Sequence, residues 1–113
     1  LIRVRVVHAA RTLPAVDVDV GGDGVKDALA LPLGGASQVA GFELPADARA
    51  PIDLYDASTG APVARFTVPA LPAQSEVLWV LTGLGDRPSS AADGLAMLGV
   101  ARSAVLGFVR AGE

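Results

Sequence analysis

Short segments of the chain alternate apolar and polar residues with a period of two, which is the pattern of half-buried β-strands. Residues 2–6 alternate Ile or Val with Arg, and residues 16–20 alternate Val with Asp. The same alternation recurs in residues 37–44, 52–55 and 63–68. Each of these segments has one face for a core and another for solvent, as antiparallel strands commonly do.

Turn-forming residues separate the predicted strands. Three glycines in residues 21–24 stop strand pairing, because glycine adopts a positive φ without steric cost. Ser, Thr and Gly at 58–60 predict a hairpin that joins residues 52–55 to residues 63–68. Two prolines in residues 69–72 then end the returning strand.

The second half of the chain predicts three more strands. Residues 75–82 are apolar at most positions, which predicts a strand in the middle of a sheet, covered on both faces. Residues 95–100 and 104–109 predict the last two strands, and residues 83–93 between them and the central strand predict the longest exposed loop. We expect residues 104–109 to be internal, because a long apolar edge strand would pair with another chain as a dimer or a tandem-domain junction.

About seven to eight strands separated by Gly and Pro turns predict an all-β protein, an antiparallel β-sandwich. Helix competes with strand at two places. Residues 25–33 and residues 89–97 have the composition of a short helical turn, although Pro32 and Gly94 limit its length.

Composition narrows the class of protein. The chain has 113 residues, so we expect one domain over residues 1–113. It has no cysteine, 51% hydrophobic residues and a net charge of −3 with no basic run, which argues against a disulfide scaffold, a zinc module, a disordered segment and a nucleic-acid-binding protein. No apolar run is long enough for a membrane span. The chain begins with Leu1 rather than Met, which suggests a trimmed or processed chain.

One segment carries a resemblance to a known family. Residues 5–10, Arg-Val-Val-His-Ala-Ala, and residues 13–22, Leu-Pro-Ala-Val-Asp-Val-Asp-Val-Gly-Gly, resemble the opening signature of the bacterial domain-of-unknown-function family 4397. The chain departs from it at Asp19, where members usually carry an aromatic residue. The resemblance implies an immunoglobulin-like sandwich in an exported protein, with an extracellular, cell-surface or periplasmic location, and it implies no established activity.

His8 is the first candidate for chemistry, because it is the only imidazole in the chain. It shares the parity of the apolar positions in residues 2–6, which points it to the core or to the end of the sandwich. If Asp17 lies opposite, a hydrogen bond between the two would fix the histidine tautomer. A hydrolase built on His8 and Asp17 would also need a nucleophile, and residues 35–39 lack the G-x-S-x-G pattern. We therefore interpret His8 as a structural residue and expect no enzyme.

The acidic stretch of residues 17–24 is the second candidate. It carries Asp17, Asp19 and Asp23, and carboxylates at this density are typical ligands of Ca²⁺. The stretch resembles only the first half of an EF-hand loop, because the position of the final bidentate acid is Ala28. A solvated strand face followed by a polar turn explains the same residues.

Charge pairing makes a further prediction about strand order. If the first two strands are neighbours, Arg3 and Arg5 would pair with Asp17 and Asp19 across them. Such exposed pairs contribute about 0.2–1 kcal/mol each and would favour one register.

Together these features predict a non-catalytic β-sandwich module of an exported or cell-surface bacterial protein, with a structural, adhesive or protein-interaction role. Its partner would be a protein or a component of the cell envelope, and we expect no cofactor. The alternative is a domain that binds a small ligand or Ca²⁺ at residues 17–24. The candidate ligand-binding residues are His8, Asp17, Asp19 and Asp23.

Overall fold

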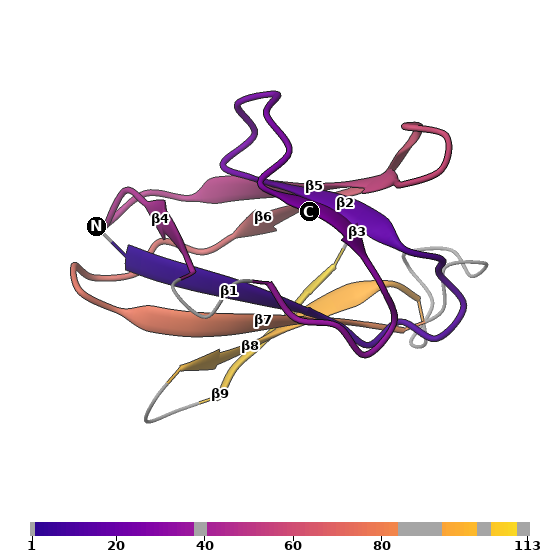
Figure 1. The fold of residues 1–113 in the computed structure, drawn as a ribbon. Helices are drawn as coiled ribbons and strands as arrows, with labels where there is room; N and C mark the ends of the chain where they lie inside the picture. The colour runs from indigo at the N-terminus through magenta and orange to yellow at the C-terminus, as the bar shows by residue number, and fades with distance from the viewer. Residues whose placement is uncertain (1, 38–40, 84–93, 102–104, 111–113) are drawn as a thin grey trace.

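The computed structural model describes residues 2–37, 41–83, 94–101 and 105–110. These residues form two β-sheets that pack face to face (Figure 1). Sheet A contains, in spatial order, β4 (Phe42–Leu44), β1 (Ile2–His8), β7 (Glu76–Thr82), β8 (Ala96–Ala101) and β9 (Val105–Arg110). Sheet B contains β3 (Ala28–Leu31), β2 (Val16–Val20), β5 (Ala50–Asp56) and β6 (Pro62–Val68). The prediction of an all-β, immunoglobulin-like sandwich is confirmed, with nine strands in the described residues.

The core lies between the sheets and is built from the inward positions of the alternating segments. The largest fully buried side chains are those of Trp79, Phe66, Ile52, Leu54, Leu81 and Met97. Burying an aliphatic or aromatic side chain of this size stabilises the fold by about 1.5–3 kcal/mol. The strand alternation seen in the sequence therefore identifies the residues that hold the sheets together.

Neighbouring strands are antiparallel except at one pair. β1 runs parallel to β7, with Val6 beside Trp79, and antiparallel to β4 on its other side. β1 and β2 consequently belong to different sheets, so the predicted pairing of the two N-terminal arginines with Asp17 and Asp19 is wrong. Arg3 instead stands between Glu43 and Glu76 in the register of sheet A.

Two expectations about the later strands also need correction. β7 is central in sheet A, as predicted, but only its inward face is buried, and Leu78 and Val80 on the outward face are half-buried. β9 is an edge strand of sheet A rather than an internal one. Among the described strands, β9 pairs with β8 alone. The local sequence of a strand does not specify how many neighbours it has, so this edge position could not be predicted from residues 104–109.

The helical turn considered for residues 25–33 is wrong, because Ala28–Leu31 form β3 against β2. Pairing with a neighbouring strand outweighs the weak local helix preference of this segment. Of residues 89–97, only 94–97 are described, and Ala96 begins β8. The loop predicted at 83–93 lies outside the described residues except for its first residue, and the predicted strand at 37–44 is observed over Phe42–Leu44.

The hairpin predicted at residues 58–60 is confirmed, because it joins β5 to β6. Asp56 Oδ1 accepts hydrogen bonds from the Ser58 amide at 2.8 Å and the Ser58 hydroxyl at 2.6 Å. Gly60 has a φ of 75° and donates its amide to the Asp56 carbonyl at 2.7 Å. Short polar side chains and a glycine thus close the turn.

In the described part of the chain, no helix is long and apolar enough to cross a membrane.

Candidate functional site

Acidic side chains gather on the outward face of sheet B. Because side chains alternate along β2, Asp17 and Asp19 point away from the core that the neighbouring valines enter. In the register of the sheet, Asp19 stands opposite Asp53 of β5, and Asp53 stands opposite Arg65 of β6. The β2–β3 loop, which projects from this side of the sandwich, adds further acids (Figure 1).

Both carboxylate oxygens of Asp17 accept hydrogen bonds from nearby residues. Its Oδ1 accepts the Ala30 amide at 2.8 Å, and its Oδ2 accepts a hydrogen bond from Lys26 Nζ at 3.0 Å. These two interactions, the Ala30 hydrogen bond first, lower the pKa of Asp17 below its usual value. Lys26 also lies over the ring of Tyr55, 5.1 Å from its centroid. Asp17 is therefore a structural carboxylate with both oxygens engaged.

Asp53 is held by Arg65 in a bidentate ion pair. Arg65 Nε donates to Asp53 Oδ1 at 2.6 Å, and Arg65 Nη2 donates to Oδ2 at 2.8 Å. The Asp53 carboxylate raises the pKa of the guanidinium, which keeps Arg65 fully charged. Both oxygens of Asp53 are thus already occupied.

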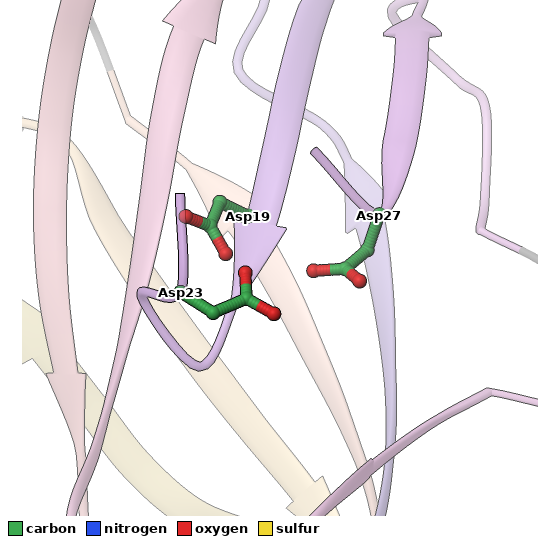
Figure 2. A group of neighbouring side chains, drawn as sticks. All are labelled: Asp19, Asp23 and Asp27. Atoms are coloured by element: carbon green, nitrogen blue, oxygen red, sulfur yellow. The ribbon is translucent and has the colours of Figure 1, made fainter. Parts of the chain in front are cut away.

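The acids that come together without such partners are Asp19, Asp23 and Asp27. One carboxylate oxygen from each lies within 4.8 Å of the others, and Figure 2 shows the three groups turned toward a shared space. Asp19 belongs to β2, Asp23 to the loop, and Asp27 directly precedes β3. We call these three residues the aspartate cluster. Within the described residues, they are the group that could hold a metal ion.

Backbone amides fix each carboxylate of the aspartate cluster. The Gly24 amide donates to Asp19 Oδ2 at 2.9 Å, and the Val25 amide donates to Asp23 Oδ1 at 3.0 Å. The Val20 amide donates to Asp27 Oδ2 at 2.7 Å. One oxygen of each aspartate is therefore tied to the main chain.

Glycine conformations allow the loop to fold back over sheet B. Gly21, Gly22 and Gly24 have φ values of 102°, 69° and 84°, which other residues rarely adopt. A Cβ at Gly22 would also lie 2.6 Å from Cγ of Pro51, so the loop passes close to β5 at this point. The glycines that interrupt the strand pattern thus bring the acids of the loop back to Asp19.

Asp19 is the buried member of the aspartate cluster. Only 1% of its surface is exposed, and its Oδ1 is buried without a hydrogen-bond partner. Burial raises the pKa of Asp19, and the neighbouring Asp23 carboxylate raises it further, against the lowering effect of the Gly24 and Asp23 backbone amides. The cluster therefore contains an acceptor that the fold itself leaves unsatisfied.

His8 lies far from these acids in the topology, at the end of β1 in sheet A. It is fully buried; the Ala10 amide donates to Nδ1 at 3.2 Å, and Nε2 lies 2.9 Å from the Pro14 carbonyl. This pattern assigns the proton to Nε2, which donates to Pro14. The predicted hydrogen bond between His8 and Asp17 is wrong, because the His8 ring nitrogens bind Ala10 and Pro14, and the Asp17 oxygens bind Ala30 and Lys26.

Of the four candidate residues, the structure brings Asp19 and Asp23 together and separates His8 and Asp17 from them. Sequence reasoning missed Asp27. The available signal was a third aspartate, four residues after Asp23, on the far side of the glycine turn. A chain that reverses at the turn returns this residue to the end of β2.

The outward face of sheet A is charged on β1, which presents Arg3 and Arg5, and apolar on the three strands that follow it across the sheet. Two cross-strand rows run from β7 through β8 to β9, and the outward positions hold aliphatic or aromatic residues. The rows are Leu78–Val100–Val105 and Val80–Leu98–Phe108. On the edge strand β9, Val105 is 68% exposed and Phe108 is 63% exposed.

Comparisons of the chain with protein-family models, curated proteins and solved structures found no match.

Proposed function

We propose that the chain is a non-catalytic β-sandwich module of an exported or cell-surface bacterial protein, and that it associates through β9 and the outward face of sheet A. The resemblance of residues 5–22 to the domain-of-unknown-function family 4397 supports the exported location. The observation that carries the association is the exposure of Val105 and Phe108 on an edge strand.

The state of His8 supports a non-catalytic role. A general base must reach a substrate with a free ring nitrogen. His8 is fully buried, and its two ring nitrogens are engaged by the Ala10 amide and the Pro14 carbonyl. The imidazole therefore serves the fold rather than proton transfer.

The edge position of β9 supports a contact with another β-strand. An edge strand presents backbone donors and acceptors that lack strand partners, and natural edges are usually protected by charge, proline or a bulge. β9 contains no proline, and its one charged residue is Arg110 at its end, while a register shift between Gly99 and Val100 marks a bulge in its pairing with β8. The apolar residues between these two features are the least protected part of the edge.

The occupant that we propose is a second copy of this chain. Two identical strands that pair antiparallel are related by a two-fold axis, so each copy supplies the donors and acceptors that the other lacks. The apolar rows of sheet A would then continue from one copy into the other. Cross-strand apolar pairs contribute about 0.2–1 kcal/mol each, so the dimer is expected to be weak and reversible.

Sedimentation velocity over a wide range of protein concentrations tests this proposal. We expect reversible dimerisation of the wild type and a monomer for Phe108→Lys. The matched control is Leu29→Lys, because Leu29 is 70% exposed on the edge strand β3 of sheet B. A wild type that stays monomeric throughout, or a Leu29→Lys variant that dissociates as readily as Phe108→Lys, would show that the proposal is wrong.

A further inference from the structure

We infer that Asp19, Asp23 and Asp27 bind a divalent cation of the calcium class. The site lies on sheet B, in the layer opposite the proposed dimer contact, so it goes beyond the proposed function and does not depend on it.

The spacing of the aspartate cluster fits one shared ion. Protein oxygens bind Ca²⁺ at about 2.3–2.6 Å, so two ligands of one ion lie no more than about 5 Å apart. The three carboxylate oxygens lie within 4.8 Å of one another. The geometry thus allows one ion to contact all three aspartates with little rearrangement.

The buried Asp19 oxygen indicates a ligand independently of this spacing. Asp19 Oδ1 is shielded from solvent and accepts no hydrogen bond in the described structure. A buried carboxylate oxygen without a partner is strongly unfavourable, and either a proton or a cation relieves it. Figure 2 shows one oxygen of Asp19 directed toward the Asp23 carboxylate, so an ion between the aspartates would reach this side chain.

Charge balance favours a cation over the protein's own side chains. The two cationic side chains bound to acids of this face, Lys26 and Arg65, pair with Asp17 and Asp53. No hydrogen bond or ion pair in the described residues joins either one to the aspartate cluster. Arg65 also interacts electrostatically with Asp19, but less than with Asp53, so the negative charge of the cluster is only partly offset.

The ligand chemistry points to Ca²⁺ rather than to Mg²⁺ or a transition metal. All three groups are hard oxygen donors, and no histidine or cysteine stands with them. Ca²⁺ accepts irregular oxygen sites, whereas Mg²⁺ requires a nearly ideal octahedron. Three protein carboxylates leave the remaining positions to water, and we expect a Kd of about 10⁻⁴–10⁻³ M, the range of extracellular modules.

Calorimetric titration of the full chain with CaCl₂, in buffer of constant ionic strength at neutral pH, tests the site. We expect saturable binding of one ion by the wild type, weaker binding of Mg²⁺, and at least a tenfold loss of Ca²⁺ affinity in Asp19→Asn. Asp23→Asn should lose affinity in the same way, which keeps the test informative if Asp19→Asn fails to fold. Asp17→Asn is the matched control, because Asp17 lies on the same strand but binds Lys26 and Ala30.

Amide NMR spectra recorded during the same titration locate the ion. We expect Ca²⁺ to shift the amides of Gly24 and Val25, which donate to Asp19 and Asp23, without comparable shifts at β9. Absence of Ca²⁺ binding, with Asp19 and Asp23 sharing a proton instead, would overturn the inference. Equal loss of affinity in Asp17→Asn and Asp19→Asn would overturn it too.

Discussion

Gly99 of β8 stands directly opposite Trp79 of β7, and the indole ring occupies the space where a side chain at position 99 would lie. A Cβ at Gly99 would be 2.7 Å from both Cη2 and Cζ3 of Trp79, and 3.1 Å from Cβ of Leu106 on β9. The largest core side chain therefore depends on the absence of a side chain on the neighbouring strand.

Substitution of Gly99 tests this packing. Gly99→Ala should destabilise the protein by about 1–3 kcal/mol, because a methyl group forced into a packed core displaces rigid ring atoms. The free energy of unfolding from urea denaturation, followed by Trp79 fluorescence, measures the effect. Trp79→Phe removes both clashing ring atoms, so Gly99→Ala should be less destabilising in that background. Strictly additive effects would contradict the steric explanation.

Replacement of His8 separates its hydrogen bonds from its packing. His8→Leu keeps most of the apolar volume but leaves the Ala10 amide and the Pro14 carbonyl without their partner. Each buried unsatisfied group costs about 1–3 kcal/mol, so the midpoint of chemical denaturation should fall clearly. The midpoint of His8→Gln should fall less, because glutamine retains an amide donor. A His8→Leu variant as stable as the wild type would show that packing alone explains His8.

Acid should weaken the fold partly through Asp17. Its folded-state pKa is lowered from the ordinary 3.8, so its contribution is fully present above that value and is lost as the pH falls through the lower folded pKa. Melting temperatures of Asp17→Asn should therefore be lower than those of the wild type at neutral pH and converge with them in acid. Lys26→Met should retain most of the acid dependence, because the Ala30 hydrogen bond lowers the pKa most. Parallel curves for wild type and Asp17→Asn would contradict this assignment.

The backbone of β3 stores strain at one residue. Ala30 has a φ of 51°, in the region that favours glycine, and it is held there while its amide binds Asp17. Ala30→Gly should therefore stabilise the protein by up to about 1 kcal/mol, because glycine adopts this conformation freely. Ala28→Gly, on the same strand but without a positive φ, should be destabilising. Thermal denaturation of the two variants measures the difference. An equal loss of stability in both variants would show that the Ala30 backbone is not strained.

The strands could be predicted where their signal is local. Residues 16–20 and 52–55 alternate between the inward and the outward face of sheet B because a strand has a period of two, whatever its neighbours, although Asp17, Asp19 and Asp53 on the outward face are buried as well. Strand order is different, since it depends on contacts between distant segments. Nothing near residues 2–8 shows that they pair with Glu76–Thr82, and nothing near Val105–Arg110 shows that they form an edge.

The acidic site was predicted in part for the same reason. Asp19 and Asp23 stand close in sequence on either side of a glycine turn, so their proximity follows from local structure. Asp27 joins them only because the loop reverses and β3 pairs with β2. Asp17 does not join the aspartate cluster, because its carboxylate binds Lys26, whose ammonium group also lies over the ring of Tyr55.

The parallel neighbour of β1 sets the order in which the chain can assemble during synthesis. Ile2–His8 are synthesised before their partner Glu76–Thr82, and more than sixty residues separate the two strands in the sequence. Until β7 is made, β1 can pair with β4 alone among its two neighbouring strands, so its other edge stays without a strand partner. β1 also lies between β4 and β7, so a protein that lost its first strand would be opened through the middle of sheet A rather than trimmed at its margin.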